Sequence, residues 1–381
     1  MQGATAARVL GRYELGPRAG VGSAGSVFRA RDVQGGADVV IKFFDGQEDG
    51  YAPWVAELRL VARFKHPHIV PCLGAGYDEG FGLWALVFAP ARGGSLRRAL
   101  AAGRRFSAEQ TIASLSQIAA ALAYAHGLGV VHRDVKPENI LAQDEDEQSP
   151  WLLTDFGAGR YLSAGQVARS PAGSAEYMAP EVWQGQATAL SDQYSLGVLG
   201  MELLLGHIPL EKERNVESPP RLEVGDVSTL WNVLARLVSP DPSARFPDMT
   251  QVQDALQQAW KHMKTHHETV ELLRTYLRNT RGESEAQIER LIAEWGERGS
   301  FTDFLVTRNL LPRTTARALD AIHKGYLDVT PHSVLGIAPL PGSTTAPTAA
   351  PPSDSPAPTA GETPNTPPPR PPTRVESPVQ P

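Results

Sequence analysis

Residues 132–139 read His-Arg-Asp-Val-Lys-Pro-Glu-Asn, and this stretch decides how the chain is interpreted. At average composition, a given residue type occupies a fixed position by chance roughly 5% of the time. The four residues His132, Arg133, Asp134 and Asn139 therefore occur together by chance on the order of once per 10⁵ positions. The stretch is thus a specific signal by itself.

Two weaker signals precede this stretch. Residues 20–27 read Gly-Val-Gly-Ser-Ala-Gly-Ser-Val, between strand-like runs. Glycines let a backbone approach phosphate oxygens with its N–H groups, although a plain hairpin turn would use the same residues. The second signal is Lys42, which ends the apolar run 39–41. A lysine on the buried side of a strand must be paired with an acidic group, and Glu57 on the next predicted helix is a suitable partner. The alternative is that Lys42 lies on an edge strand and its aliphatic stem passes the strand towards solvent.

Two short triplets follow the stretch: Asp-Phe-Gly at 155–157 and Ala-Pro-Glu at 179–181. In this order, the five signals resemble the catalytic domain of Hanks-type (eukaryotic-like) protein kinases, most of all the serine/threonine branch found in bacteria. The resemblance covers about residues 13–262. It implies an α+β, two-lobe protein-kinase fold, with an N-lobe at about 13–89, a C-lobe at about 90–262 and a nucleotide cleft between them.

The resemblance also implies ATP and Mg²⁺ as cofactors and a serine or threonine of a protein substrate as the acceptor. The implied catalytic residues are Asp134, which orients the attacking hydroxyl, Lys136, which reaches the γ-phosphate, and Lys42, which holds the α- and β-phosphates and is itself held by Glu57. The implied metal ligands are Asn139 and Asp155. A lysine at position 136 is typical of serine/threonine rather than tyrosine specificity, and every position of the motif set is filled.

The implied nucleotide-binding residues are Gly20, Gly22, Gly25, Val27, Val40, Lys42, Ala89, Ala91 and Leu141. Val40 stands where the family usually has alanine, so the adenine pocket is expected to be tighter. Phe88 is expected at the rear of this pocket, and Ala89-Pro90-Ala91 at the hinge, where backbone groups bind adenine.

Ser170 and Ser163 are candidate regulatory sites. Ser170 lies four residues before Ser174, which stands where the family usually has threonine. Arg133, next to Asp134, is typical of kinases whose activation loop is held by a phosphate. We expect another copy of the protein to phosphorylate Ser170, so that the phosphate pairs with Arg133. Because Pro171 follows Ser170, phosphorylation by a proline-directed upstream kinase is the alternative.

Other polar residues are interpreted as structural. Glu181 and Arg245 resemble the family's buried ion pair, and Asp192 resembles the aspartate that binds the catalytic-loop backbone. His66, His68 and His126 are interpreted as packed or surface histidines without a functional role. A glycosidase pair made of Asp134 and Asp155 is disfavoured by the motifs around both residues.

Hydrophobic patterning predicts the main elements. Strands are expected over 13–15, 27–30 and 39–44, a helix through Trp54 that ends before His66, a strand pair near 140–141 and 151–154, and long helices over 111–126 and 190–205. Residues 265–330 predict three or four short helices, interpreted as a packing or partner-binding module.

The last 45 residues, 337–381, hold 15 of the 32 prolines. Such a composition cannot bury enough apolar surface to fold, so we expect a disordered tail, with docking to a proline-reading module as the alternative function. A second reading of the whole chain follows: a signalling scaffold with a kinase fold, which recruits partners through residues 265–330 and this tail. Such a scaffold would have no need of the complete catalytic set.

Composition excludes several other classes. One cysteine, Cys72, among 381 residues excludes an internal disulfide framework, and the formal net charge of −6 argues against nucleic acid or an anionic membrane as the main partner. Neither a signal pattern nor a long apolar run stands out, so a cytoplasmic protein without a membrane anchor is expected. Its partners are expected to be protein substrates and, for phosphorylation of Ser170, a second copy of itself.

Replacement of Ser170 by alanine tests the regulatory hypothesis. We expect Ser170→Ala to have lower activity than the phosphorylated wild type, because no phosphate can then pair with Arg133 and order the loop. Peptide phosphorylation is measured for both proteins with and without phosphatase treatment. Full activity of Ser170→Ala after phosphatase treatment would contradict the hypothesis.

Overall fold

The structure is a computed structural model that describes residues 8–22, 25–44, 48–158, 160–161, 175–214, 227–295, 301–323 and 331–336. These residues belong to one compact unit, Met1–Ile337, whereas a second unit, Ala338–Pro381, contains almost all of the predicted tail. The predictions for the tail, and for Ser163, Ser170 and Ser174, therefore concern positions outside the described residues.

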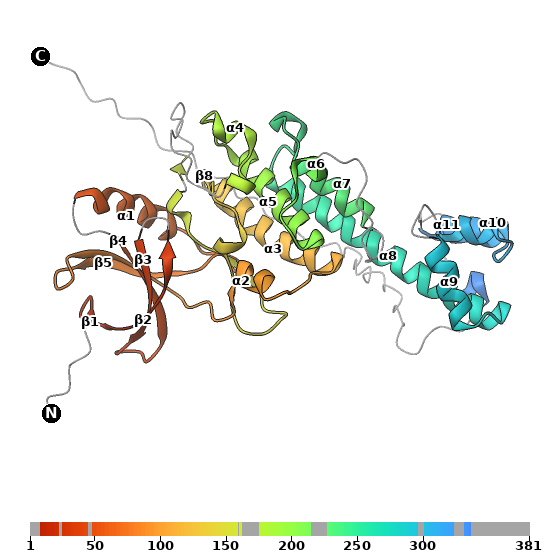
Figure 1. Cartoon of the computed structure of the whole chain (residues 1–381), viewed down its shortest axis with the longest axis horizontal. Coiled ribbons are helices and arrows are strands. Elements are labelled where there is room, and N and C mark those ends of the chain that lie inside the picture. Colours follow the sequence, from red (N-terminus) through yellow and green to blue (C-terminus); the bar gives the residue numbers. More distant parts are fainter. Residues whose placement is uncertain are drawn as a thin grey trace, which may run out of the picture. The chain divides into compact units, whose positions relative to one another are not determined.

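The N-terminal part is a curled sheet of six antiparallel strands, drawn in red and orange in Figure 1. The strand order is β1-β2-β3-β4-β6-β5. The backbone N–H of Leu10, just after β1, donates to the carboxylate of Asp78 at the end of β5 over 2.5 Å, so the two edges of the sheet approach each other. The strands are β1 (Arg8–Val9), β2 (Tyr13–Gly22), β3 (Gly25–Asp32), β4 (Asp38–Phe44), β5 (Cys72–Asp78) and β6 (Leu83–Phe88).

Strand β4 shows how the sequence divides the two faces of this sheet. Side chains alternate between the faces of a strand, and Val39, Ile41 and Phe43 are buried in a small core on one face. Lys42 and Phe44 therefore point to the other face, where helix α1 (Glu48–Val61) and the cleft lie. The same alternation places a lysine in the interior, where it requires ionic partners.

Helix α1 packs on the sheet through its apolar side. The indole N–H of Trp54 donates to the carbonyl of Ala85 on β6 over 3.1 Å, and Leu60 and Val61 are buried in the main core. The helix ends at Val61, before His66, as the sequence predicted.

The C-terminal part is mainly helical, and the predicted long helices and strand pair are confirmed. A capping box of Ser107 and Gln110 begins α3, and Thr188 caps α5. Helix α5 is buried around its whole circumference from Ser191 to Leu203, which makes it the centre of this part. The described elements are β7 (Gly94–Ser95), α2 (Leu96–Ala101), α3 (Ala108–Gly127), β8 (Val130–Val131), η1 (Pro137–Asn139), β9 (Ile140–Ala142), β10 (Trp151–Leu153), η2 (Phe156–Ala158), β11 (Arg160–Tyr161), η3 (Ala175–Tyr177), α4 (Pro180–Trp183), α5 (Ala189–Leu205), α6 (Glu211–Arg214), α7 (Ser228–Leu237), η4 (Pro242–Ala244) and α8 (Met249–Arg281).

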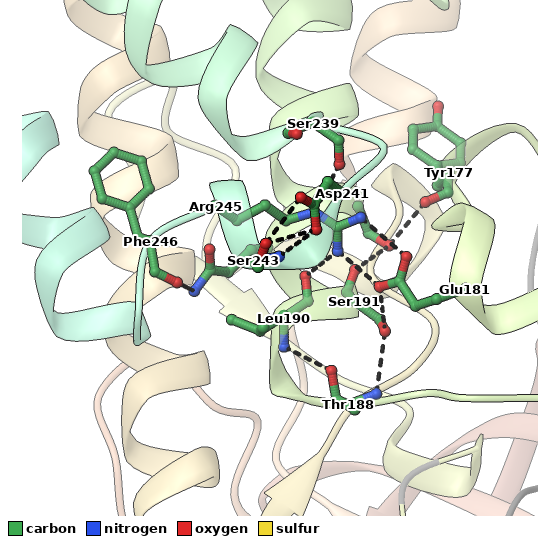
Figure 2. A network of polar contacts seen from close by, with 12 residues as sticks. Tyr177, Glu181, Thr188, Leu190, Ser191, Ser239, Asp241, Ser243, Arg245 and Phe246 are labelled. Carbon is green, nitrogen blue, oxygen red and sulfur yellow. Dashed lines mark hydrogen bonds and ion pairs between the residues drawn. The ribbon is translucent and has the colours of Figure 1, made fainter.

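An ion pair between Glu181 and Arg245 ties the end of α4 to the loop before α8 (Figure 2). The guanidinium donates to both carboxylate oxygens over 2.7 and 2.9 Å, and also to the carbonyls of Leu190 and Ser239. Burial alone would raise the pKa of Glu181, but the hydrogen bonds from Arg245 and Ser191 outweigh burial and lower it. The pair that the sequence predicted is therefore present, with its hydrogen-bonding groups satisfied.

Helix α8 continues from the C-lobe into the helical module without a break. Leu256 and Ala259 belong to the main core, whereas Leu273 and Leu277 belong to a second hydrophobic cluster. No glycine or proline occurs between Met249 and Arg281, so no residue in this stretch would interrupt a helix. The boundary that the sequence analysis places at 262–265 thus falls inside one helix.

The second cluster gathers the remaining helices: α9 (Glu285–Trp295), α10 (Phe301–Thr307), α11 (Arg313–His323) and α12 (Pro331–Leu335). Ile288 and Trp295 are buried in this cluster, and Leu291 and Ile292 pack against it, so these four residues form the apolar face of α9. Leu319 on α11 is buried in the same cluster. No helix in the described part of the chain is long and apolar enough to cross a membrane.

Replacement of Arg245 by methionine should destabilise the protein by about 3–5 kcal/mol, because the buried carboxylate of Glu181 then has no counter-ion. The measurement is the urea-induced unfolding of the wild type and the variant. In the double variant Arg245→Met/Glu181→Leu the unpaired charge is gone, and most of the loss should be recovered. A double variant as unstable as Arg245→Met would show that the ion pair is not the cause.

Candidate active site

A cleft of about 660 Å³ opens between the curled sheet and the helical part. Its walls come from β2, β3 and β4 on one side and from η1, β9 and the segment after β10 on the other. Sequence-predicted residues far apart in the chain meet here. Those that line the cleft are Gly20, Val27, Val40, Lys42, Glu57, Phe88, Ala89, Ala91, Lys136, Asn139, Leu141 and Asp155.

Lys42 is the central cation of the cleft, and its side chain is only 6% exposed. Its Nζ lies 2.7 Å from Oε2 of Glu57 and 2.8 Å from Oδ1 of Asp155. Desolvation would lower the pKa of Lys42, but the two carboxylates outweigh it and raise the pKa, so the ammonium keeps its charge. A fixed positive charge therefore stands at the inner wall of the cleft.

Phe156 and Gly157, the two residues after Asp155, help to keep the carboxylates of Glu57 and Asp155 beside Lys42. Phe156 is 1% exposed and packs against Phe64 next to α1, with 4.5 Å between the centroids of the two tilted rings. A Cβ atom on Gly157 would lie 2.8 Å from Oε2 of Glu57 and 3.1 Å from Oδ1 of Asp155. A side chain at position 157 would therefore displace the carboxylate of Glu57 from its place beside Lys42.

The loop at 132–139 presents a second polar cluster. Asp134 is 6% exposed, and its Oδ2 lies 2.7 Å from Nζ of Lys136. The amide nitrogen of Asn139 donates to Oδ2 and to the carbonyl of Asp134, over 2.9 and 2.8 Å. Since the nitrogen of this amide serves Asp134, its oxygen is the atom that Asn139 can offer to a cation.

The backbone of this loop is held from behind by Asp192, which is fully buried. Its carboxylate accepts hydrogen bonds from the backbone N–H groups of His132 and Arg133, both over 2.8 Å. Burial would raise the pKa of Asp192, but the hydrogen bond with His126, over 2.8 Å, and the other contacts lower it. Arg133 has a φ of +70°, an unfavourable conformation that these bonds maintain.

His126 is a residue that the sequence analysis left without a role. It comes from the last turn of α3 and contacts the aspartate that holds the loop. A histidine at the C-terminal end of a helix is a common favourable placement, but nothing in the sequence linked it to Asp192.

The metal ligands implied by the sequence have suitable donor atoms. Asp155 offers a carboxylate and Asn139 an amide oxygen, the hard oxygen donors that Mg²⁺ prefers, and both line the same cleft. Asp155 has a φ of +60°, so its backbone is also held in a conformation that is rare outside glycine. The residues present therefore fit a magnesium ion bound together with phosphate oxygens.

The apolar end of the cleft is formed by Val27, Val40 and Leu141, with Phe88 beside them. The backbone N–H of Ala89 donates to the carbonyl of Pro71 over 2.9 Å. The carbonyl of Ala89 is therefore the backbone group that this residue can offer to a ligand. This end is suited to a flat, apolar ring whose edge makes backbone hydrogen bonds.

The glycine-rich segment is only partly in the cleft. Gly20 lines the cleft, whereas the backbone of Gly25 packs so closely on β4 that a Cβ would lie 1.7 Å from the carbonyl oxygen of Phe43. Gly22 pairs with Gly25 across the β2–β3 turn, and residues 23–24 lie outside the described residues. Gly25 is thus required for close packing of the hairpin on β4.

A model of the protein kinase domain family matches residues 13–262, which is more than half of the chain. This chain belongs to the protein kinase family. The match spans both walls of the cleft and includes every motif described above.

Curated kinases show the same similarity. The kinase domain is 36% identical over 205 residues to the serine/threonine-protein kinase PknL of Mycobacterium tuberculosis, which covers 52% of this chain and 50% of that protein. It is 34% identical over 218 residues to the probable serine/threonine-protein kinase pknA2 of Bifidobacterium longum, and this match covers 55% of this chain and 28% of that protein. The CBL-interacting protein kinase 16 of Oryza sativa is 33% identical over 261 residues, and this match covers 62% of this chain and 54% of that protein. The chain thus spans about half the length, or less, of these relatives.

The kinase domain also places residues in the cleft that the sequence analysis did not name. Arg29 and Arg98 are exposed and line it from β3 and α2. Arg29 lies two residues after Val27 on the same strand, so the alternation of side chains was a signal for its position. Arg98 follows the helix cap Ser95 by three residues, but the orientation of α2 towards the cleft had no local signal.

Replacement of Gly157 by alanine should lower phosphoryl transfer by about tenfold or more, because the added methyl group separates Glu57 and Asp155 from Lys42. The measurement is kcat with a peptide substrate and ATP. Gly127→Ala, at the end of α3 with no atom near the new Cβ, is the matched control and should keep wild-type kcat. Equal rates for both variants would refute the steric argument.

Proposed function

We propose that the chain is a serine/threonine protein kinase, which transfers the γ-phosphoryl group of ATP to a serine or threonine hydroxyl of a protein. The observation that carries the proposal is the convergence of Lys42, Asp155 and Asn139 in one cleft, beside Asp134. Phosphoryl transfer depends mainly on positioning and on neutralising charge on phosphate oxygens, and this cleft offers groups for both tasks.

Lys42 is proposed to bind the α- and β-phosphates. It is already charged and oriented by Glu57, so little reorganisation is needed when a triphosphate enters. A bound triphosphate competes with Asp155 for the ammonium, which releases this carboxylate for a cation. Asp155 and the amide oxygen of Asn139 would hold Mg²⁺, which would neutralise charge on the phosphates.

Asp134 is proposed to orient the acceptor hydroxyl. The oxygen of this hydroxyl forms a bond to the γ-phosphorus, the bond from that phosphorus to the β–γ bridging oxygen breaks, and ADP leaves with the electron pair. The hydroxyl proton passes to the carboxylate of Asp134. Lys136, which contacts Asp134 over 2.7 Å, lies close enough to neutralise the transferred group.

The preference for serine and threonine is supported by Lys136 and by the names of the two bacterial relatives. The adenine ring is proposed to lie between Val27, Val40 and Leu141, with hydrogen bonds to the backbone of Ala89 and Ala91. Phosphorylation of Ser170, and of Ser163 as the second candidate, is part of the proposal on sequence grounds. Arg133, whose backbone N–H is held by Asp192, is the proposed partner of the phosphate.

Residues 273–335 support a second, binding function. The described residues of this stretch form a hydrophobic cluster of their own, in which Trp295, Phe301 and Leu305 are buried. A module with its own core at the end of a kinase domain is suited to recruit a protein partner or substrate. This function accompanies the proposed catalysis and does not replace it.

Transfer of label from γ-labelled ATP tests the proposed function. Asp155→Asn should reduce the rate by about 100-fold or more, because it removes a charged metal ligand and a partner of Lys42. Asp254→Asn, an exposed position on α8, is the matched control and should keep the wild-type rate. If the wild type and Asp155→Asn label equally little while residues 265–381 still capture partners, the chain is a scaffold and the proposal is wrong.

A further inference from the structure

Arg97 on α2 joins three separate segments beside the cleft. Its Nε donates to Oε1 of Glu138 over 2.7 Å, and its Nη1 donates to Oε1 of Glu202 over 2.7 Å. Its Nη2 donates to the hydroxyl of Tyr177 over 2.5 Å. Tyr177 in turn donates to the second oxygen of Glu202. These four residues are called the Arg97 network.

Glu202 and Tyr177 form the inner half of the network, with the side of Arg97 that contacts them, and this half is buried. Glu202 is 2% exposed and Tyr177 is 3% exposed. Burial and the adjacent carboxylate raise the pKa of the Tyr177 phenol, so it stays neutral and acts as a donor. Desolvation of Arg97 is outweighed by its hydrogen bonds with Glu138 and Glu202, which raise its pKa and keep it cationic. This half satisfies a buried carboxylate and serves stability.

The outer half of the network has a different character. The side chain of Glu138 is 44% exposed, and an ion pair of this kind contributes at most about 1 kcal/mol to folding. Three-point attachment of a planar guanidinium nevertheless fixes direction, because all of its donors have set angles. The contact of Arg97 with Glu138 therefore restricts orientation more than it stabilises the fold.

Glu138 sits within the proposed catalytic loop. It is the middle residue of the η1 turn, between Pro137 and Asn139. The N–H of Asn139 donates to the carbonyl of Lys136 over 3.0 Å, and the side chain of Asn139 binds Asp134. An anchor on Glu138 thus restrains the turn that carries both Lys136 and Asn139.

The other end of the network lies where the chain leaves the segment that contains Ser170. Tyr177 belongs to η3, the first described element after residues 162–174. Its carbonyl accepts a hydrogen bond from Ser195 of α5 over 2.8 Å, so the backbone of Tyr177 is attached to this buried helix.

We infer that Arg97 is a positioning residue for phosphoryl transfer: it aligns the η1 turn, through Glu138, with Tyr177 at the exit of the activation segment. The inference rests on the proposed kinase function. Arg97 is not required to touch ATP or the acceptor; it acts on Lys136 and Asn139 through Glu138. Loss of the contact should therefore lower kcat and leave the KM for ATP nearly unchanged.

The test uses a background in which the buried charge is already removed, because Arg97→Met alone would leave Glu202 without a cation and could unfold the protein. Glu202→Gln keeps a polar partner for both Arg97 and Tyr177 and serves as the reference. In this background, Arg97→Met and Glu138→Ala are each expected to lower kcat by about tenfold, measured well below the thermal midpoint of each variant so that the loss does not come from unfolding. If Arg97 acts through Glu138, the variant with both changes loses no more than either one alone.

Arg278→Met in the same background is the control for removal of an arginine. Arg278 is 53% exposed and pairs with Glu285 in the helical module, so kcat should not change. The inference is overturned if Arg97→Met keeps the kcat of the reference, or if the losses of Arg97→Met and Glu138→Ala add up.

Hydrogen exchange of the backbone amides of residues 134–139 separates this inference from the proposed function. Exchange requires no catalysis, and it should be faster in Arg97→Met/Glu202→Gln than in Glu202→Gln. If the wild type transfers no label while exchange still responds to Arg97→Met, the proposed kinase function is overturned, and only the restraint of residues 134–139 by Arg97 is supported. A wild type that transfers label while neither kcat nor exchange responds to Arg97→Met would overturn the positioning role alone.

Discussion

A buried ammonium group determines much of this molecule. Lys42 has almost no access to water, and a charge in such a place is retained only if carboxylates replace its hydration. One carboxylate comes from α1 and the other from the segment after β10, so the sheet, the helix and the helical part must all meet at one point. Trp54 holds α1 against the sheet, and Phe156 packs against Phe64, which follows α1.

The polar groups of the kinase domain serve two purposes. Asp192, Glu181 and Arg245 are nearly or fully buried, and their hydrogen bonds hold backbone groups and neighbouring side chains in place. They hold the chain in conformations such as the positive φ of Arg133. Groups with more access to solvent, such as Lys136 and Asp155, line the cleft, where a ligand can replace their present partners. Arg97 belongs to both sets, because one side of its guanidinium serves a buried carboxylate and the other a loop.

Several parts of this arrangement were predictable from local patterns. The alternation in β4 predicts that Lys42 faces away from Ile41, and the apolar patterning predicts the long helices α3 and α5. Strands β9 and β10 were also predicted as a pair. The motif at 132–139 identified the loop on which Asp134, Lys136 and Asn139 lie close together.

The sequence by itself determined the family, the main helices and strands, and the set of polar residues that could serve a triphosphate, because each of these depends on short-range spacing. Only the tertiary structure decided which groups meet. Asp155 reaches Lys42 across 113 positions, Arg97 reaches Glu202 across 105, and His126 reaches Asp192 across 66. Such pairs depend on how elements cross in space, and a local pattern of residues does not encode those crossings.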